Sequence, residues 1–188
     1  MRVCVYCSSS DAVPQVYVRA ARKLGELIGT RGHSLVFGGG AVGLMGVLAE
    51  GAHRSGARVT GVMPRAFEGR GISSPHVEEM IVTADMRERK AAMAERADAF
   101  IALPGGFGTL EELLESITLK QLGYHSKAVA LLDTGGFYSP LLEQFERLYA
   151  LSFAKAAYRR LYHVAADPEG ALEYVESYRP SPLVSKWF

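Results

Sequence analysis

Apolar and polar positions follow two repeating patterns along the whole chain. Short apolar runs have the composition of strands buried in a parallel sheet, and between them apolar residues recur at the three- and four-residue spacing of amphipathic helices. The alternation predicts an α/β fold, namely a single doubly wound, Rossmann-like domain over residues 1–179, with a mainly parallel sheet, helices on both faces and a tail at 180–188. The predicted strands are residues 2–7, 33–37, 58–63, 79–82, 99–103, 128–132 and 161–164, and the predicted helices are residues 14–28, 110–122, 138–151 and 168–178, with two more beginning after Gly43 and at Asp85.

Length, charge and hydropathy narrow the class of protein. The 188 residues suffice for one α/β domain, and the net charge of +1 leaves no basic surface for nucleic acid or an anionic membrane. No apolar run approaches the ~20 residues of a transmembrane helix, and the N-terminal residues lack the features of a signal peptide. We therefore expect a cytoplasmic protein with no nucleic-acid or membrane partner. In the tail, Trp187 and Phe188 are expected to become ordered only by docking on a partner.

Two cysteines, Cys4 and Cys7, stand close together in the first predicted strand. A redox pair of this spacing belongs at a helix N-terminus. Within a strand, the odd spacing directs the two thiols to opposite faces. Both cysteines are expected to serve packing.

The segment from Leu103 to Glu112 carries the strongest chemical signal. It follows a buried strand, contains Gly105, Gly106 and Gly108, and opens an amphipathic helix. Glycines allow a ligand to approach the backbone closely, and the first N–H groups of a helix attract anions. The Gly-Lys-Ser/Thr sequence that ends a Walker loop is missing. The pattern predicts a phosphate-binding turn with the carboxylate of Glu112 one helical turn away.

The same residues also admit a purely structural interpretation. Thr109 and Glu112 stand three positions apart, which is the spacing of a capping box. In that arrangement both side chains bind N–H groups at the start of the helix, and Glu112 has no chemical role. The local pattern alone leaves capping and catalysis equally open.

A second glycine-rich turn follows the second predicted strand. Gly38, Gly40 and Gly43 formally match the dinucleotide fingerprint, but no acidic residue stands about 20 positions later to hold a ribose hydroxyl. We interpret this turn as another place where backbone approaches a ligand closely. The polar loop that begins at Ser8 follows the first strand, and carboxyl ends of parallel strands share one edge of a sheet. The loop at 64–75, with its charged centre, is expected to lie near the same edge.

The helix that begins at Asp85 places several basic residues in its first turns. Asp85 is the predicted N-cap, with Glu88 three positions later. Arg89 and Lys90 lie on the side of Met86 and are expected to face a cleft. Basic residues near a helix N-terminus oppose the helix dipole, so they suit either a solvated surface or a site that binds an anion.

A phosphate-binding turn, one carboxylate and one arginine define a limited chemistry. The histidines are scattered outside these loops, and no nucleophile–base pair or metal-ligand cluster is recognisable. A carboxylate can orient water and stabilise a cationic sugar while an arginine and the turn hold the phosphate. This chemistry cleaves a glycosidic bond and requires neither metal nor cofactor.

Two motifs resemble those of a known family. The segment Pro104–Glu112 resembles the P-G-G-x-G-T-x-x-E motif of the LONELY GUY (LOG) family of cytokinin riboside 5′-monophosphate phosphoribohydrolases, and Met86–Lys90 resembles its M-x-x-R-K motif. The resemblance implies hydrolysis of N6-modified adenosine 5′-monophosphates, and possibly of AMP, to a free base and ribose 5-phosphate. It also implies a homodimer, and it makes Arg89 and Glu112 the catalytic pair. The residues expected to bind substrate are Ser9, Gly39, Gly40, Met86, Lys90, Gly105, Gly106, Phe107, Gly108, Thr109, Glu115 and Thr118.

Two other functions compete with this interpretation. A non-catalytic carrier of a nucleotide or of molybdenum cofactor has a similar fold, but a carrier has no need of both Arg89 and Glu112. A nicotinamide oxidoreductase is disfavoured by the missing acidic residue. The family has also been labelled lysine decarboxylase, yet neither Lys90 nor Lys120 stands in a recognisable pyridoxal phosphate context.

Overall fold

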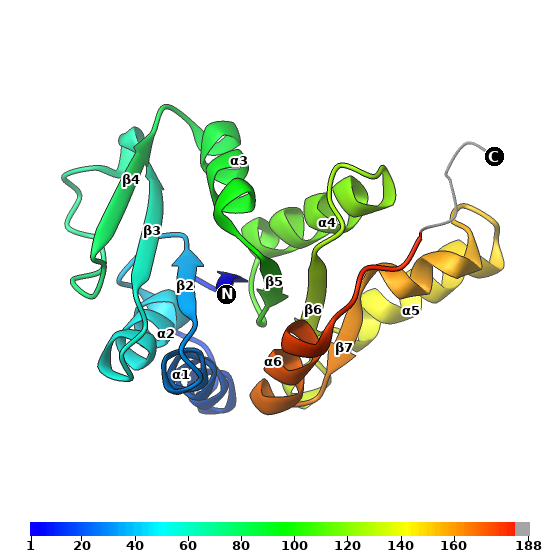
Figure 1. Ribbon diagram of the computed structural model, residues 1–188, viewed down its shortest axis with the longest axis horizontal. Coiled ribbons are helices and arrows are strands. Elements are labelled where there is room, and N and C mark those ends of the chain that lie inside the picture. Colours follow the sequence, from blue (N-terminus) through cyan, green and yellow to red (C-terminus); the bar gives the residue numbers. More distant parts are fainter. Residues whose placement is uncertain (183–188) are drawn as a thin grey trace.

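The computed structural model of the chain describes residues 1–182. Trp187 and Phe188, for which the sequence suggested docking on a partner, lie outside this range. The described residues form one sheet of seven parallel strands in the order β4-β3-β2-β1-β5-β6-β7 (Figure 1). The strands are β1 Arg2–Tyr6, β2 Ser34–Phe37, β3 Val59–Pro64, β4 Glu79–Thr83, β5 Ala99–Ala102, β6 Ala128–Leu132 and β7 His163–Ala165.

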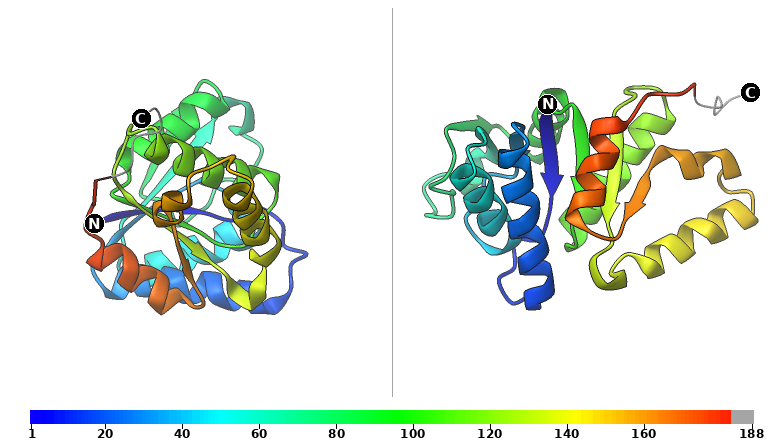
Figure 2. Two further views of the ribbon diagram at one scale, coloured as in Figure 1. Left: turned by 90° about the vertical axis from the view of Figure 1, so that its right-hand side faces the viewer. Right: turned by 60° about the horizontal axis from the view of Figure 1, so that its bottom comes forward.

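Helices cover both faces of this sheet, as the sequence predicted. Two views at right angles show helices above and below the strands (Figures 1 and 2). The helices α1, α2 and α6 cover one face, and α3, α4 and the start of α5 cover the other. Their bounds are α1 Gln15–Thr30, α2 Gly43–Arg54, α3 Met86–Arg96, α4 Phe107–Gln121, α5 Ser139–Ala150 and α6 Pro168–Ser177. Within residues 1–182, no helix combines the length and the hydropathy needed to cross a membrane.

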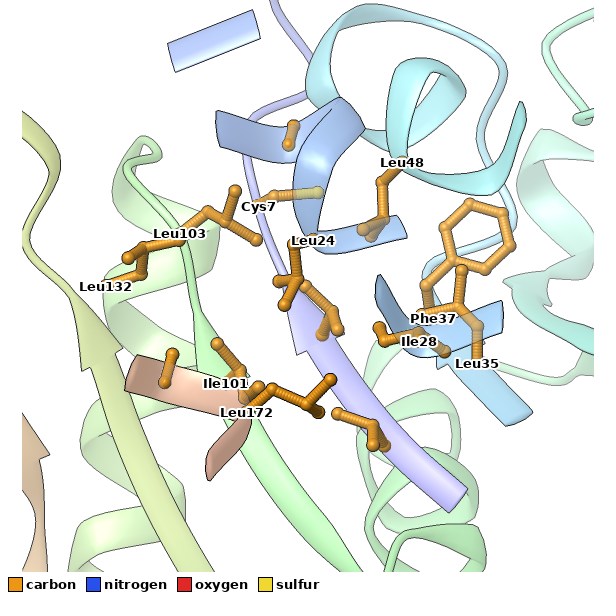
Figure 3. Packing of buried hydrophobic residues seen from close by; sticks show 14 of the residues in the cluster. Cys7, Leu24, Ile28, Leu35, Phe37, Leu48, Ile101, Leu103, Leu132 and Leu172 are labelled. Atoms are coloured by element: carbon orange, nitrogen blue, oxygen red, sulfur yellow. The ribbon is translucent and has the colours of Figure 1, made fainter. Parts of the chain in front are cut away.

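The core consists of two apolar layers separated by the sheet. Leu24, Leu48 and Leu172 reach the strands from α1, α2 and α6 in one layer (Figure 3). Cys7 belongs to that layer, whereas Cys4 belongs to the layer beneath α3 and α4. The predicted opposite orientation of the two cysteines is therefore confirmed, and both are buried and unpaired.

Most element boundaries lie within two residues of the sequence prediction, and two of the differences have a structural cause. The helix expected at 110–122 begins three residues earlier, at Phe107. The last strand, expected at 161–164, begins only at His163, because Leu161 ends a short 3₁₀ helix that spans Ala156–Leu161 and buries the leucine without strand pairing. In both places an apolar residue departs from the periodic pattern: Phe107 is exposed in the first turn of a helix, and Leu161 is buried outside a strand.

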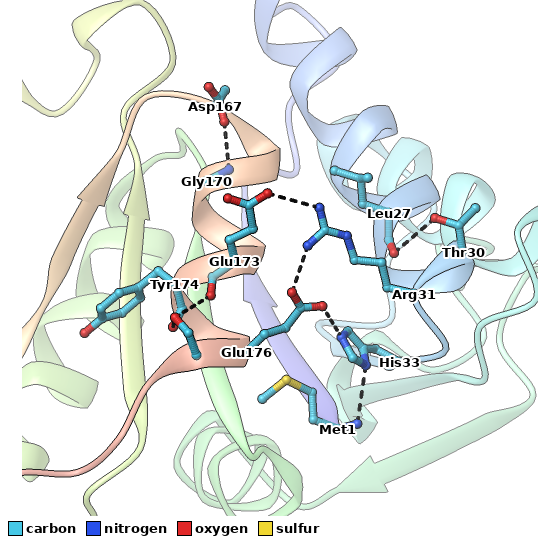
Figure 4. Close-up of polar contacts among 11 residues, drawn as sticks. Met1, Leu27, Thr30, Arg31, His33, Asp167, Gly170, Glu173, Tyr174 and Glu176 are labelled. Carbon is cyan, nitrogen blue, oxygen red and sulfur yellow. Dashed lines mark hydrogen bonds and ion pairs between the residues drawn. The ribbon is translucent and has the colours of Figure 1, made fainter.

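An ion-pair network joins α1 to α6 at the amino edge of the sheet (Figure 4). The Glu176 carboxylate accepts hydrogen bonds from Arg31 Nη1 at 2.8 Å and from His33 Nε2 at 2.7 Å. Burial by itself raises the pKa of Glu176, but the hydrogen bonds from His33 and Arg31 outweigh it, so the pKa is lowered. The network therefore favours the ionised carboxylate.

Glu176→Gln is expected to lower the free energy of unfolding at pH 7 by roughly 0.5–1.5 kcal/mol, because partly buried ionic hydrogen bonds are lost. A carboxyl whose pKa is lowered by folding contributes stability above its unfolded pKa, and this contribution disappears as the pH falls through the folded pKa. Urea unfolding at pH 7 and at pH 3 measures the change. Glu169→Gln is the matched control on the same helix, since Glu169 pairs with Lys23 and both side chains are more exposed. An equal loss in the two variants would contradict the prediction.

Candidate active site

The loops after β1, β2 and β5 meet at the carboxyl edge of the sheet, as the parallel topology requires. A cavity of about 330 Å³ opens there between the loop after β1, the first turn of α3 and the N-terminus of α4. It contains eight of the residues that the sequence singled out. The lining residues are Cys7, Ser8, Ser9, Ser10, Met45, Met86, Arg89, Gly106, Phe107, Gly108, Thr109 and Glu112.

Arg89 is fixed in this cavity by contacts from two other elements. Its Nε donates to the carbonyl oxygen of Val62 on β3 at 3.0 Å, and its Nη1 donates to Glu112 Oε1 on α4 at 2.8 Å. The side chain is only 11% exposed. Arginine presents its donors in a rigid planar fork, so two anchors leave the guanidinium little freedom to turn.

Glu112 faces this guanidinium from α4 with 9% of its side chain exposed. Burial raises the pKa of Glu112, and the charge and hydrogen bond of Arg89 limit the rise. Only Oε1 is bound by Arg89, and Oε2 accepts no hydrogen bond from residues 1–182. The second oxygen is therefore free to meet a substrate or a water molecule in the cavity.

Gly38 provides the space that the guanidinium occupies. A Cβ at this position would lie 2.2 Å from Arg89 Nη2 and 3.0 Å from the Met45 sulfur. Any side chain here would displace the arginine. The sequence indicated that the second glycine turn allows close approach, and at Gly38 the group that approaches is Arg89.

The N-terminus of α4 has no side-chain cap. Gly106 is the N-cap residue, no side chain binds the first N–H groups, and the first turn has no acidic residue. The capping-box interpretation is therefore wrong: Thr109 lies inside the helix, where its side chain packs against Gly105, and Glu112 pairs with Arg89 instead. The first N–H groups of the helix, those of Phe107, Gly108 and Thr109, therefore have no side-chain partner, which is the arrangement that suits an anion.

Several predicted residues lie outside this cavity. Lys90 pairs with Glu111 and, at 3.2 Å, with Glu115, so the Lys90 and Glu115 side chains bridge α3 and α4. Thr118 donates to the Leu114 carbonyl and borders a separate apolar cavity. Gly105 lines a cavity on the other side of its turn.

Gly39 and Gly40 connect the second glycine turn to the loop at 64–75. The Gly39 carbonyl accepts from Ser74 N, and Gly40 forms an isolated antiparallel bridge with Ser73. Arg65–Phe67 forms a 3₁₀ helix at the start of that loop. This structure places the end of the loop beside the glycine turn.

Sequence reasoning missed three contributors to the site. Val62 acts through its carbonyl oxygen, and no side-chain pattern indicates such a role. Met45 lines the cavity from the first turn of α2, and the sequence pattern assigned it no role. Cys7 also lines it, and because burial raises the pKa of its thiol, it presents a neutral group to the cavity.

Comparison with known proteins gives one consistent family. The sequence profile of the family described as "Possible lysine decarboxylase" matches residues 45–175. The probable cytokinin riboside 5′-monophosphate phosphoribohydrolase LOGL2 of Oryza sativa subsp. japonica is 45% identical over 187 residues, covering 98% of this chain and 77% of that protein. The cytokinin riboside 5′-monophosphate phosphoribohydrolase LOG5 of Arabidopsis thaliana is 42% identical over 179 residues, covering 95% of this chain and 78% of that protein.

Solved structures with a similar fold include molybdenum cofactor proteins. The molybdenum cofactor binding protein of Rippkaea orientalis superposes with a TM-score of 0.72 at 27% identity, covering 94% of this chain and 95% of that one. The molybdenum cofactor carrier protein of Chlamydomonas reinhardtii gives 0.69 at 28% identity, covering 93% and 95%. The profile match and the higher identity to the phosphoribohydrolases together show that this chain belongs to the LONELY GUY (LOG) family.

Proposed function

We propose that this protein hydrolyses the N-glycosidic bond of N6-modified adenosine 5′-monophosphates and releases the free base and ribose 5-phosphate. The observation that carries the proposal is the buried pair of Arg89 and Glu112, joined at 2.8 Å beside the uncapped N-terminus of α4. The two relatives described above bear the name of this activity.

The first step in this mechanism is placement of the phosphate. Phe107, Gly108 and Thr109 line the cavity in the first turn of α4, where helix N–H groups attract a phosphate and no acidic side chain repels it. Glu112 lies one helical turn further along α4, which leaves room for a ribose between the phosphate and the carboxylate. The sugar C1′ atom then lies beside Glu112.

In this mechanism Glu112 acts at the face of the ribose opposite to the departing base. Its Oε2 accepts a proton from water, the water oxygen attacks C1′, and the C1′–N9 electron pair leaves with the base, which takes up a proton. The negative charge on Glu112 stabilises the cationic sugar that develops, while Arg89 holds the carboxylate in place. The products are ribose 5-phosphate and the neutral base.

Lysine decarboxylation does not fit this cavity. Pyridoxal phosphate requires a lysine for its Schiff base, and none of the described cavity-lining residues is a lysine. Lys90 bridges α3 to Glu111 and Glu115. Lys120 is fully buried, with its Nζ over the Tyr178 ring at 4.6 Å from the ring centroid. No step through that cofactor is proposed.

Base release from isopentenyladenosine 5′-monophosphate, AMP and isopentenyladenosine tests the proposal directly. We expect release from the modified monophosphate and little release from the nucleoside, because the nucleoside lacks the phosphate that the α4 turn binds. Chromatography of the free base is the measurement. Binding of the monophosphate without release would instead favour a nucleotide carrier, the function that similarity to the molybdenum cofactor carriers suggests.

The assembly and location form part of the same proposal. We infer a homodimer, supported by Phe107, which is 93% exposed at the mouth of the cavity in the single chain; light scattering after gel filtration measures the molar mass. Cytoplasmic location is supported by the two unpaired thiols of Cys4 and Cys7, since disulfides are rare in reducing compartments.

A further inference from the structure

A cavity of about 300 Å³ lies at the amino edge of the sheet, where β1, β2, β3 and β4 begin. We call it the amino-edge cavity; its lining residues are Arg2, Ser34, Val36, Arg58, Thr60, Glu79 and Arg96. It shares no lining residue with the cavity of Arg89 and Glu112. Arg96 follows Arg89 by about two turns of α3, or roughly 10 Å along the helix axis, so the two spaces are separate.

The floor of the amino-edge cavity carries two hydroxyl groups. Val36 pairs in register with Thr60, and Ser34 precedes Val36 by two residues, so the three side chains lie on one face of the sheet. Thr60 is only 8% exposed, and neither its hydroxyl nor that of Ser34 has a hydrogen-bond partner within residues 1–182. Buried hydroxyls are normally paired, so this floor is suited to a ligand that accepts hydrogen bonds.

Three arginines from different elements line the same cavity. Arg2 lies on β1, Arg58 directly precedes β3, and Arg96 lies in the last turn of α3. Glu79 is the only acidic residue among the described lining residues, so the lining has an excess of positive charge. The C-terminal end of a helix carries a partial negative charge, and Arg96 offsets it at the end of α3. The lining therefore favours an anion over a cation.

The carboxylates that pair with these arginines leave part of each guanidinium free. Arg2 donates from Nε and Nη2 to Asp98, and Arg58 donates from Nη2 to Glu79 at 3.0 Å. Arg96 is paired only with its neighbour in the sequence, at 4.0 Å. Within residues 1–182, Nη1 of Arg2 and of Arg58 and Nη2 of Arg96 bind no acceptor. Because exposed ion pairs are weak, a ligand can share these guanidinium groups.

We propose that the amino-edge cavity binds a phosphate group, either as inorganic phosphate or as the ester of a small sugar. A phosphate presents several strong acceptor oxygens to donors on different sides. Here Arg58 and Arg96 supply charged donors from the sheet and from α3, and Ser34 and Thr60 supply hydroxyls from the floor. A carboxylate has only two oxygens and would leave more of these donors unbound. The inference uses no residue of the α4 turn, so it is independent of the proposed function.

Titration of ¹⁵N-labelled protein with inorganic phosphate and with ribose 5-phosphate, at constant ionic strength, tests this proposal. We expect the backbone amide signals of Ser34 and Thr60 to shift to saturation. Combining Arg58→Gln with Arg96→Gln should weaken the affinity measured from these signals at least about tenfold, because charge-assisted hydrogen bonds are lost. Thr60→Val, which removes one hydroxyl, should weaken it about threefold and serves if the double variant does not fold. Tighter binding of ribose 5-phosphate identifies an ester as the ligand, and equal affinity identifies the phosphate group alone.

Arg54→Gln is the matched control, since Arg54 also forms an exposed ion pair with a glutamate but lies outside the amino-edge cavity. It should leave the affinity unchanged. The inference is overturned if the Ser34 and Thr60 signals of the wild type do not shift, if the double variant and Thr60→Val keep the wild-type affinity, or if Arg54→Gln weakens binding as much as the double variant does.

The amide signal of Gly108 reports separately on the α4 turn. If it shifts while the signals of Ser34 and Thr60 do not, the inference fails and the proposed function stands. If only the Ser34 and Thr60 signals shift, the inference stands and the proposed function loses its phosphate-binding turn.

Discussion

Glu112→Gln is expected to lower kcat for base release by about 10²- to 10⁴-fold, the range typical of losing a general base. The amide preserves the size of the side chain, and its oxygen can still accept the hydrogen bond from Arg89 Nη1. It cannot take a proton from water, and it carries no charge to stabilise a cationic sugar. Steady-state release of base from isopentenyladenosine monophosphate gives kcat, and thermal unfolding establishes that the variant is folded.

Glu111→Gln is the matched control for this prediction. Glu111 precedes Glu112 on α4, but its side chain is 55% exposed and pairs with Lys90 outside the cavity. Its kcat should stay within about threefold of the wild type. Because burial raises the pKa of Glu112, wild-type kcat/KM should fall on the acid side at a higher pH than an exposed glutamate would give. If a folded Glu112→Gln protein keeps more than a tenth of wild-type kcat, Glu112 is not the general base and serves only to position Arg89.

Gly38→Ala is expected to lower kcat by about 10²-fold, because a displacement of about 1 Å in a catalytic group has that order of effect. The new Cβ would lie 2.2 Å from Arg89 Nη2, so the guanidinium must move away from Glu112 or from Val62. Gly38 is not among the residues with a positive φ, so alanine fits its backbone. Kinetics and thermal unfolding are measured on the same preparation.

Gly170→Ala is the control for a glycine replacement that does not affect the arginine. Gly170 lies in the first turn of α6, where a Cβ would lie 3.3 Å from Asp167 Oδ1. We expect wild-type kcat from this variant. If Gly38→Ala retains full activity at an unchanged unfolding temperature, the position of Arg89 is less critical than the contacts of Val62 and Glu112 suggest.

The fold was predictable from the sequence because the alternation of apolar strands and amphipathic helices is repeated along the whole chain. The five inner strands are apolar runs that are almost entirely buried, and apolar residues recur at helical spacing between them, so the parallel topology and the edge shared by the loops follow without tertiary information. The meeting of Arg89 and Glu112 was expected from two motifs and is present at 2.8 Å. Their catalytic roles remain a proposal.

What the sequence did not predict depends on contacts between elements. Arg89 and Lys90 are adjacent on α3, and periodicity predicted that both face the cleft. In the structure they pair with different residues of α4. Arg89 forms an ion pair with Glu112 inside the cavity, whereas Lys90 forms ion pairs with Glu111 and Glu115 outside it. The periodic pattern also failed to predict that α4 begins at Phe107. Phe107 is an apolar residue in the first helical turn that remains exposed, so it does not contribute to a buried helical face.

The contact between Arg89 and β3 is made through the carbonyl oxygen of Val62. A backbone acceptor is present whatever side chain the residue carries, so the anchor imposes no requirement on the identity of residue 62. It depends instead on β3 keeping its alignment with β2 and β4, in which Val62 pairs with Ile81. Two members of this family can therefore hold the same arginine in the same place with different residues at this position. This anchor gives no reason for the side chain of residue 62 to be invariant, although one of the two hydrogen bonds that hold Arg89 is made to its backbone.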